Sequence, residues 1–280
     1  MRKTAIDSHQ HFWNLDLFQY DWMSPGNPIL SQNYVPEKFE PILTEVEVEK
    51  VVAVQAHQSL AETRWLLALS DKFDFIAGVV GWVDLLDENV AGQITELAKH
   101  PKFKGVRHLV QDEPEDDWIL QPQVLQSINK LSEFNLTYDI LIFPKHLKYI
   151  PGLIEKCPHT SFVIDHLAKP PIAAGEIADW KKDLKAVAEF SGVYCKLSGL
   201  VTEADQKNWH REELRPYVET ALELFGAERL MFGSDYPVCL PAASYQTVLE
   251  TYRSFLQDLS ENEQAQIMRE NAMSFYNLQV

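Results

Sequence analysis

The sequence predicts a distorted (β/α)8 barrel of the TIM type. Short apolar runs rich in β-branched residues alternate with longer amphipathic runs along the 280 residues, which is the pattern of repeated βα units. The chain has eight strand-like runs and seven clear helix-like runs between them, as one barrel requires. No linker-like stretch or internal repeat divides the sequence, so we expect a single barrel domain over residues 1–280.

The expected elements follow one another in regular order. Strands are predicted at residues 4–6, 51–55, 75–80, 105–108, 136–141, 161–165, 193–197 and 230–232. Helices are predicted near residues 61–72, 88–99, 122–133, 145–156, 176–189, 211–225 and 242–257.

Two segments are additional to the eight βα units of a minimal barrel. Residues 13–50 form a long, aromatic connection after the first strand, and we expect it to fold over the barrel mouth and end in a helix near 36–47. The tail over 260–276 is predicted as an extra C-terminal helix, because Ser260 suits an N-cap and Glu263 stands at the capping-box position.

Composition and charge exclude several classes of protein. The 41 acidic residues against 25 basic ones give a net charge of −16, which disfavours nucleic acid and anionic membrane surfaces as partners. Cys157, Cys195 and Cys239 are widely spaced, as expected of reduced thiols in a cytoplasm. The sequence shows no signal peptide and no apolar run long enough to span a bilayer. We expect a cytoplasmic protein whose partner is a small molecule, with a homo-oligomer left open.

Polar residues gather at the predicted strand ends, where barrel enzymes carry their chemistry. In His9-x-His11 the two side chains point to one face of an extended segment and can converge on one ion or one substrate oxygen. Taken alone, the pair could equally hydrogen-bond the following loop. The presence of His166 and Asp235 at other strand ends favours a functional site.

Carboxylates near these histidines are candidates for proton transfer. Asp235 follows a strand, and Gly233 before it allows close backbone approach. Its carboxylate could take a proton from water or bind a metal, and it lies too far upstream to cap the next helix. Alternation predicts that Asp165 points away from its neighbour His166, which leaves a structural and a functional role equally open. Asp7 stands two residues before His9, so alternation places it on the same face as the two histidines, where it could orient one of their rings.

Other candidates concern the substrate. Arg107 and His108 are adjacent, so only one should face the lumen, and Arg107 suits a carbonyl or carboxylate. Five further residues are candidates for contact with the substrate, although each could instead pack in the core or lie exposed to solvent. They are His57, Trp82, His108, Lys169 and Tyr236. Lys196 could supply positive charge or be an ordinary surface lysine. No nucleophile elbow, phosphate loop or dinucleotide fingerprint is present in the sequence.

Six motifs, in order along essentially the whole chain, resemble those of the amidohydrolase superfamily. They are DSHQHFW at 7–13, GVRH at 105–108, VQDEP at 110–114, IDHLAKPP at 164–171, KLSG at 196–199 and FGSDYP at 232–237. Within the superfamily the sequence is most similar to the sugar-lactonase branch, with L-fuconolactonase and L-rhamnono-γ-lactonase as nearest kin and 2-pyrone-4,6-dicarboxylate lactonase more distant.

The resemblance implies a hydrolase with His9, His11, His166 and Asp235 in its active site. Asp235 would be the general base toward water, and Arg107 would lie near the substrate carbonyl. Binuclear members carry a lysine or glutamate bridge on strand 4 and a histidine on strand 5, whereas residues 138–141 of this chain contain no histidine. We therefore expect no second ion. One divalent ion, zinc first, on His9, His11, His166 and Asp235 stays open beside a site that requires no metal.

The sequence thus predicts a cytoplasmic lactonase that opens an L-fuconolactone-like or L-rhamnonolactone-like sugar-acid lactone, with Asp235, His166 and Arg107 as catalytic residues. Two alternatives remain at this stage. One is a metal-dependent decarboxylase of the same superfamily, and the other is a non-catalytic sugar-acid binding protein. Sugar stereochemistry and lactone ring size do not follow from the sequence.

Overall fold

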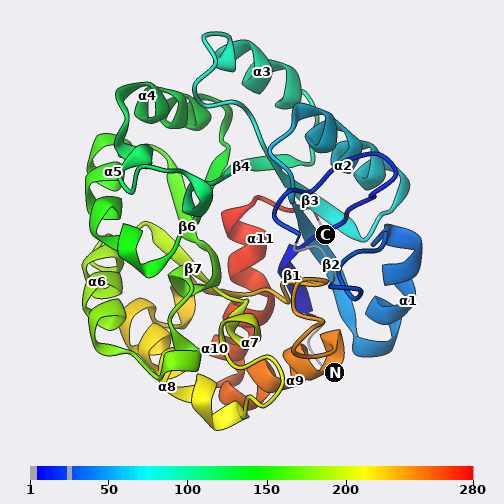
Figure 1. Ribbon diagram of the computed structural model, residues 1–280, viewed down its shortest axis with the longest axis vertical. Helices are drawn as coiled ribbons and strands as arrows, with labels where there is room; N and C mark the ends of the chain where they lie inside the picture. The colour runs from blue at the N-terminus through cyan, green and yellow to red at the C-terminus, as the bar shows by residue number, and fades with distance from the viewer. Residues whose placement is uncertain (1–4, 24–26, 280) are drawn as a thin grey trace.

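The computed structural model describes residues 5–23 and 27–279, and within these ranges it has one sheet of eight parallel strands. Each strand pairs with the next in sequence, and the helices surround the ring (Figure 1). The strands are β1 (Ala5–Gln10), β2 (Val48–Val54), β3 (Ile76–Gly81), β4 (Phe103–Leu109), β5 (Thr137–Leu141), β6 (Ser161–Ile164), β7 (Val193–Leu197) and β8 (Leu230–Phe232).

The ring closes where the segment after β8 meets β1. The Asp235 N–H donates to the His9 carbonyl at 2.9 Å, and the His11 N–H donates to the Tyr236 carbonyl at 2.7 Å. The predicted (β/α)8 barrel is confirmed. The first strand is longer than the predicted 4–6, of which residue 4 lies outside the described residues. Pairing with β2 extends β1 through polar residues that have the composition of a loop, so His9 lies in the strand rather than after it.

Helices follow the strands in the predicted order. Those outside the barrel are α1 (Pro36–Val46), α2 (Leu60–Lys72), α3 (Val90–Leu97), α4 (Pro122–Leu131), α5 (Ile150–Lys156), α6 (Ala178–Ala188), α8 (Arg211–Phe225) and α9 (Tyr245–Phe255). The predicted helix at 145–156 begins instead as a 3-10 turn over Pro144–Tyr149. Helix α7 (Leu200–Glu203) was not predicted, because four residues are too few to show a helical period.

Alternation along the strands separates two apolar clusters. On β2, Val51 and Ala53 belong to the large cluster between barrel and helices, whereas Val52 and Val54 belong to a smaller cluster. This smaller cluster is completed by the C-terminal residues Ala272, Tyr276 and Leu278. The C-terminal segment therefore packs against the inward-facing strand residues, and Figure 1 shows α11 within the ring of strands.

The extra C-terminal helix is confirmed, with one difference in its form. The predicted capping box is present, since Ser260 N–H donates to Glu263 Oε2 at 2.8 Å and Glu263 N–H donates to Ser260 Oγ at 3.3 Å. The segment consists of α10 (Glu261–Ala265), a π-helical turn (Gln266–Glu270) and α11 (Asn271–Phe275).

The long connection after β1 covers part of the barrel mouth, as predicted. Trp13 is fully buried and pairs with Tyr34 through main-chain hydrogen bonds of 2.9 and 3.0 Å. Trp22 Nε1 donates to the Ala56 carbonyl at 2.7 Å, which fixes the connection to the end of β2. The three cysteines are buried and unpaired. Within the described residues, every helix is too short or too polar to cross a membrane.

Candidate active site

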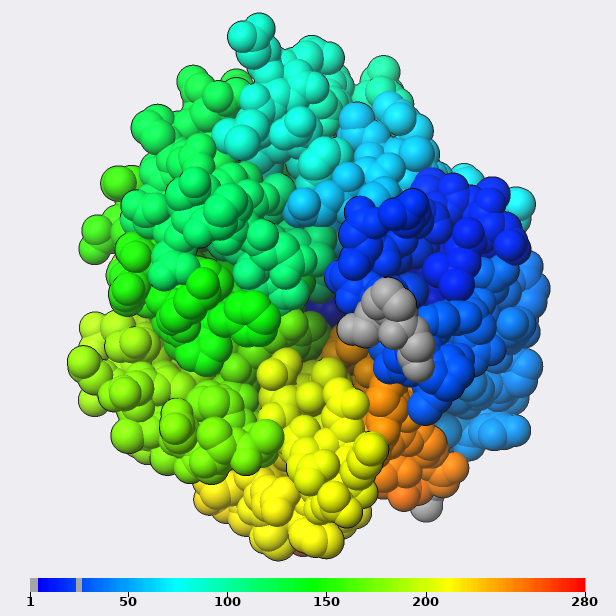
Figure 2. Space-filling model, in the orientation of Figure 1, coloured from blue at the N-terminus to red at the C-terminus, as the bar shows by residue number. Residues whose placement is uncertain are grey.

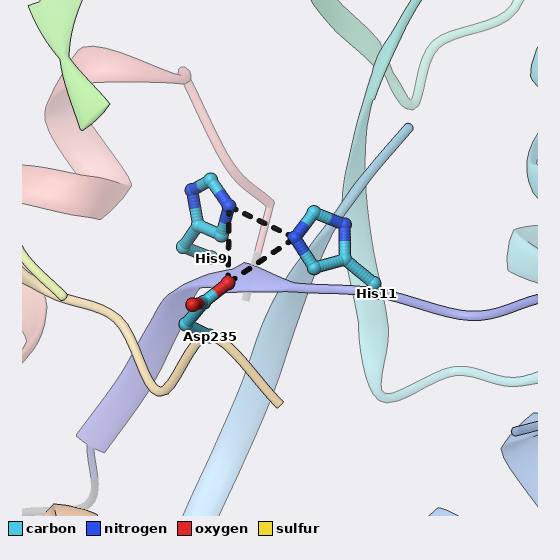
Figure 3. A group of neighbouring side chains, drawn as sticks. All are labelled: His9, His11 and Asp235. Atoms are coloured by element: carbon cyan, nitrogen blue, oxygen red, sulfur yellow. Dashed lines mark hydrogen bonds and ion pairs between the residues drawn. The ribbon is translucent and has the colours of Figure 1, made fainter. Parts of the chain in front are cut away.

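Three polar side chains from the two ends of the barrel sequence converge at its mouth. His9 Nε2 lies 3.1 Å from His11 Nε2, and Asp235 Oδ1 lies 3.9 Å from the former and 3.4 Å from the latter (Figure 3). His166 Nε2 approaches the same Asp235 oxygen at 3.8 Å. His9, His11 and Asp235 are thus close enough to hold one ion together, whereas His166 forms such a group with His9 and Asp165 instead.

A bulge in β1 gives the histidines their direction. The register with β2 shifts between Asp7 and Gln10, which turns His9 inward. Asp7 points the other way: it accepts hydrogen bonds from the Ser234 N–H at 2.9 Å and from Tyr245 of α9 at 3.0 Å. The expectation that Asp7 orients a histidine ring is therefore wrong, because the bulge breaks the alternation on which it rested.

The backbone after β8 passes very close to β1 at Gly233. A Cβ added to Gly233 would lie 2.6 Å from the Cβ of His9, so this position accepts only glycine without movement. Asp235 has a left-handed backbone with φ 58°. This turn directs its carboxylate toward the histidines.

The end of β6 departs from simple alternation. Residues 166–169 all have left-handed backbones, with φ between 52° and 56°, although none is glycine. Such a run is strained, and strain of this kind gathers at functional sites. Because the chain turns sharply here, Asp165 and His166 both point toward the centre. The prediction that Asp165 faces away from the site is therefore wrong.

His166 is held by the end of β7. Its Nδ1 lies 2.8 Å from Ser198 Oγ, which leaves Nε2 directed at Asp235. Gly199 has φ 69°, and a Cβ there would lie 2.7 Å from His166 Nδ1. The glycine thus provides both the backbone conformation and the space for the imidazole ring.

A cavity of about 510 Å³ opens above these side chains. Figure 2 shows the hollow near the middle of the face, where segments from distant parts of the chain meet. Its lining comes from the connection after β1 and from the ends of several strands: His11, Asp21, Trp22, Ala56, Arg107, Leu109, Gln111, Asp112, Leu141, His166, Lys169, Thr202, Glu203, Asp235 and Val238.

Arg107 faces the lumen and His108 does not, in agreement with the expectation that only one of them would. The Arg107 Nη1 donates to Asp165 Oδ2 at 3.3 Å and lies 3.3 Å from His9 Nε2, while Nη2 donates to the Gln55 carbonyl. The Nε of Arg107 is buried and has no protein hydrogen-bond partner among the described residues. Arg107 as a residue lines the cavity, and this nitrogen is its one donor without a protein partner among the described residues.

Of the five predicted substrate contacts, only Lys169 lines the cavity. The His57 ring packs against Tyr20 with centroids 5.7 Å apart, and Tyr236 stacks on Phe39 at 4.7 Å. His108 accepts a hydrogen bond from Trp82 at 3.2 Å and bonds Glu113 at 2.6 Å. We therefore assign no direct substrate contact to His57, Trp82, His108 or Tyr236, because packing holds each of them outside the cavity lining.

Sequence reasoning missed several residues of the site. The sequence gives no sign of Asp139 and leaves Lys196 open between a source of positive charge and an ordinary surface lysine, whereas both are fully buried beneath the site. At the rim, Gln111 Oε1 and Thr202 Oγ1 have no hydrogen-bond partner among the described residues, and Glu203 lies beside Thr202 on α7. Alternation along β7 could have indicated Lys196, but no local pattern indicates the rim residues.

Burial and neighbouring charges set the protonation states. Burial lowers the pKa of His166 to about 4 and also lowers the pKa of His9 and of His11, so the rings are neutral. Burial alone would raise the pKa of Asp235, but its interactions with His166 and His11 outweigh burial, and this pKa lies below its usual value. The site thus combines an ionised carboxylate with neutral imidazoles.

The residues fit one divalent ion. His11 Nδ1 donates to the Val54 carbonyl at 2.8 Å, so its Nε2 carries the lone pair that faces Asp235. Bonds of about 2.0–2.1 Å in tetrahedral geometry place ligand atoms about 3.3 Å apart, within the range of the His9, His11 and Asp235 separations. The Arg107 guanidinium, 3.3 Å from His9 Nε2, is a cation that competes for the same nitrogen.

The fold and the site together define a barrel enzyme with a histidine- and aspartate-rich centre at the carboxyl ends of its strands. Comparison with known proteins gives the family. The family model described as amidohydrolase matches residues 6–278, and the chain belongs to that family. The sequence-based identification is thereby confirmed.

Individual relatives are also similar. An L-fucono-1,5-lactonase of Burkholderia ambifaria is 39% identical over 235 residues, covering 83% of this chain and 80% of the relative. An L-fucono-1,5-lactonase of Burkholderia multivorans is 35% identical over 258 residues, covering 89% and 87%. The crystal structure of an amidohydrolase from Burkholderia multivorans with bound zinc is 33% identical, with a TM-score of 0.94 and coverage of 99% and 100%.

Proposed function

We propose that this protein is a lactonase that opens a sugar-acid lactone, with an L-fucono-1,5-lactone-like substrate first and an L-rhamnonolactone second. The similarity to two L-fucono-1,5-lactonases supports the substrate class. The observation that carries the reaction type is the ionised Asp235, which faces the cavity with Arg107 beside it. A cytoplasmic location is part of the same proposal and agrees with three unpaired cysteines.

In the proposed reaction, Asp235 acts first as a base. Its carboxylate takes a proton from water while the water oxygen bonds to the lactone carbonyl carbon. The bond from this carbon to the ring oxygen then breaks, and Asp235 returns the proton to that oxygen. The product is the open hydroxy acid. In this scheme His166, whose Nε2 lies 3.8 Å from the Asp235 carboxylate, orients that carboxylate.

Arg107 polarises the carbonyl in this scheme. Its two terminal nitrogens are engaged by Asp165, His9 and Gln55, which fixes the plane of the guanidinium. In this scheme its Nε, which has no hydrogen-bond partner among the described residues, donates to the carbonyl oxygen, where negative charge develops in the transition state.

We also propose that one divalent ion, zinc first, binds to His9, His11, His166 and Asp235, and that turnover does not strictly require it. A bound ion would supply Lewis-acid polarisation of a carbonyl. The zinc-bound relative supports binding, whereas the Arg107 charge beside His9 supports activity without metal. Elemental analysis followed by assay after chelation and dialysis tests both parts. Loss of all activity, restored by zinc, would contradict the second part.

A panel of aldonolactones assayed with a pH indicator tests the proposed function. We expect proton release well above the spontaneous rate for the L-fucono lactone and weaker turnover of its stereoisomers. An absence of turnover with every lactone would overturn the proposal. Carbon dioxide release from an aromatic carboxylate would favour a decarboxylase, and saturable binding unchanged by Asp235→Asn would favour a sugar-acid binding protein.

A further inference from the structure

Lys196 is a fully buried cation beneath the site, and the proposed chemistry does not use it directly. Its Nζ lies 2.6 Å from Asp139 Oδ2, 2.9 Å from Asp165 Oδ1 and 3.1 Å from His9 Nδ1. Lys196, Asp139 and Asp165 are all 0% exposed. An ammonium group without water needs such partners, because an isolated buried charge is very costly.

The strand dictates that Lys196 points inward. On β7 the side chains of Val193, Cys195 and Leu197 belong to the outer cluster between barrel and helices, whereas Tyr194 packs on the inner cluster. Lys196 stands two residues after Tyr194, so its side chain points to the same side of the strand and enters the lumen. An apolar residue at this position would extend the inner cluster, so the lysine is not required for packing alone.

Through Asp165 the ammonium group reaches the residues that face the substrate. Asp165 Oδ1 pairs with Lys196, while Asp165 Oδ2 accepts from Arg107 Nη1 at 3.3 Å. Lys196 also contacts Nδ1 of His9, whose Nε2 faces Arg107 and His11. Asp165 and His9 therefore lie between two cations, Lys196 below and Arg107 above.

The other side of Lys196 is tied to the end of the chain. Tyr276, which follows α11, donates its hydroxyl hydrogen to Asp139 Oδ2 at 2.7 Å. The Lys196 ammonium also lies 5.5 Å from the centre of the Tyr276 ring. A continuous set of contacts thus runs from the C-terminal segment through Asp139 and Lys196 to the floor of the cavity.

We propose that Lys196 is a positioning residue for the lactone opening described above: it fixes Asp165 and His9, and through them the guanidinium of Arg107. This inference rests on the proposed function. Because Lys196 does not line the cavity, its removal should alter the rate of the chemical step and leave substrate binding nearly unchanged.

The test uses a charge-compensated double variant, Lys196→Met with Asp139→Asn, which removes one cation and one anion together. In the folded variant we expect kcat to fall by about 100-fold, as for a small misplacement of a reacting group, with KM within about threefold of wild type. The control is Lys181→Met with Glu223→Gln, which removes a surface pair of the same 2.6 Å length and should leave both constants unchanged.

The outcomes are distinguishable. If the wild-type enzyme opens no lactone, the proposed function fails. If wild type is active and the folded double variant keeps kcat within about threefold, the positioning role is overturned. Tyr276→Phe removes only the far hydroxyl, and we expect about a fivefold loss of kcat with unchanged KM. Should the double variant not fold, this milder variant decides, and an unchanged kcat overturns the proposal.

Discussion

The floor and the rim of the cavity differ in how their polar groups are held. We use floor for a cluster of four residues at and beneath the base of the cavity, His9, Arg107, Asp165 and Lys196, of which Arg107 lines the cavity itself. All are at most 3% exposed, and each is in contact with at least two of the others. At the rim, Gln111 Oε1 and Thr202 Oγ1 have no hydrogen-bond partner within residues 5–23 and 27–279, and both residues lie on connecting segments. Preorganised groups suit the stabilisation of developing charge, whereas unpartnered groups are free to bind hydroxyls of the substrate.

We therefore expect the floor to determine the rate of the reaction and the rim to determine which substrate is preferred. Changes in the floor should lower kcat by large factors, because Arg107 acts in the transition state and the other three residues hold it in position. Changes at the rim should alter KM and the preference among stereoisomers, because the groups there bind parts of the sugar that do not react. The following variants test whether rate and substrate preference divide in this way.

The largest effect is expected for Asp235→Asn. The amide keeps the shape of the side chain but cannot take a proton from water, so kcat should fall by about 10³-fold or more with the fold intact. Steady-state kinetics on the preferred lactone measures this. Asp112→Asn, at an exposed carboxylate lining the same cavity, is the matched control and should change kcat less than about twofold. Near-normal activity of Asp235→Asn would contradict the assignment.

Arg107→Ala should rank second. It removes the donor toward the carbonyl and leaves Asp165 without one of its two cations, so both rate and binding should suffer. We expect kcat/KM to fall by about 100-fold or more. Arg107→Lys keeps the charge without the planar fork and should recover only a small part of the loss. Full recovery by lysine would show that charge alone is sufficient.

A third, smaller effect is expected for Gly199→Ala. The new Cβ would meet His166 Nδ1 at 2.7 Å on a left-handed backbone. The backbone strain of about 1–2 kcal/mol should lower Tm by roughly 2–8 °C, and displacement of His166 should lower kcat by about tenfold. Gly175→Ala shares the positive φ without any contact, and Gly192→Ala has neither feature. A loss of kcat in Gly175→Ala equal to that in Gly199→Ala would show that the His166 contact is irrelevant.

The smallest effect on rate is expected at the rim. Glu203→Gln, combined with Thr202→Val, removes a half-buried carboxylate and an unpartnered hydroxyl that line the cavity. KM for the preferred lactone should rise by about fivefold while kcat changes less than about twofold. Progress curves for two lactones epimeric at one hydroxyl measure the change in preference. A loss confined to kcat would place these residues with the floor rather than the rim.

Strand periodicity predicted much of this arrangement. Strands β2 to β8 lie close to their expected positions, and the grouping of His9, His11 and Asp235, with His166 beside Asp235, follows from their location at strand ends. Alternation failed where the backbone is irregular. The bulge in β1 reversed Asp7, and the left-handed turn after β6 brought Asp165 inward, and neither irregularity has a glycine that would have marked it.

The rim could not be predicted for a different reason. Asp21, Gln111 and Thr202 lie far apart in the sequence on a long connection, a 3-10 turn (Val110–Asp112) and the four-residue helix α7. These segments have no period that reveals which side chains face the cavity. Aromatic residues drew attention instead, but Tyr236 and Trp82 turned out to pack outside the cavity lining.

The most direct test of the proposed chemistry is a single turnover in H₂¹⁸O with enzyme in excess over L-fucono-1,5-lactone. If Asp235 acts as a base toward water, one ¹⁸O enters the carboxylate of the product and the peptide that contains Asp235 remains unlabelled. Incorporation of ¹⁸O into Asp235 would mean that its carboxylate attacks the carbonyl and forms a covalent intermediate. That result would contradict the account of Asp235 as the base that activates water.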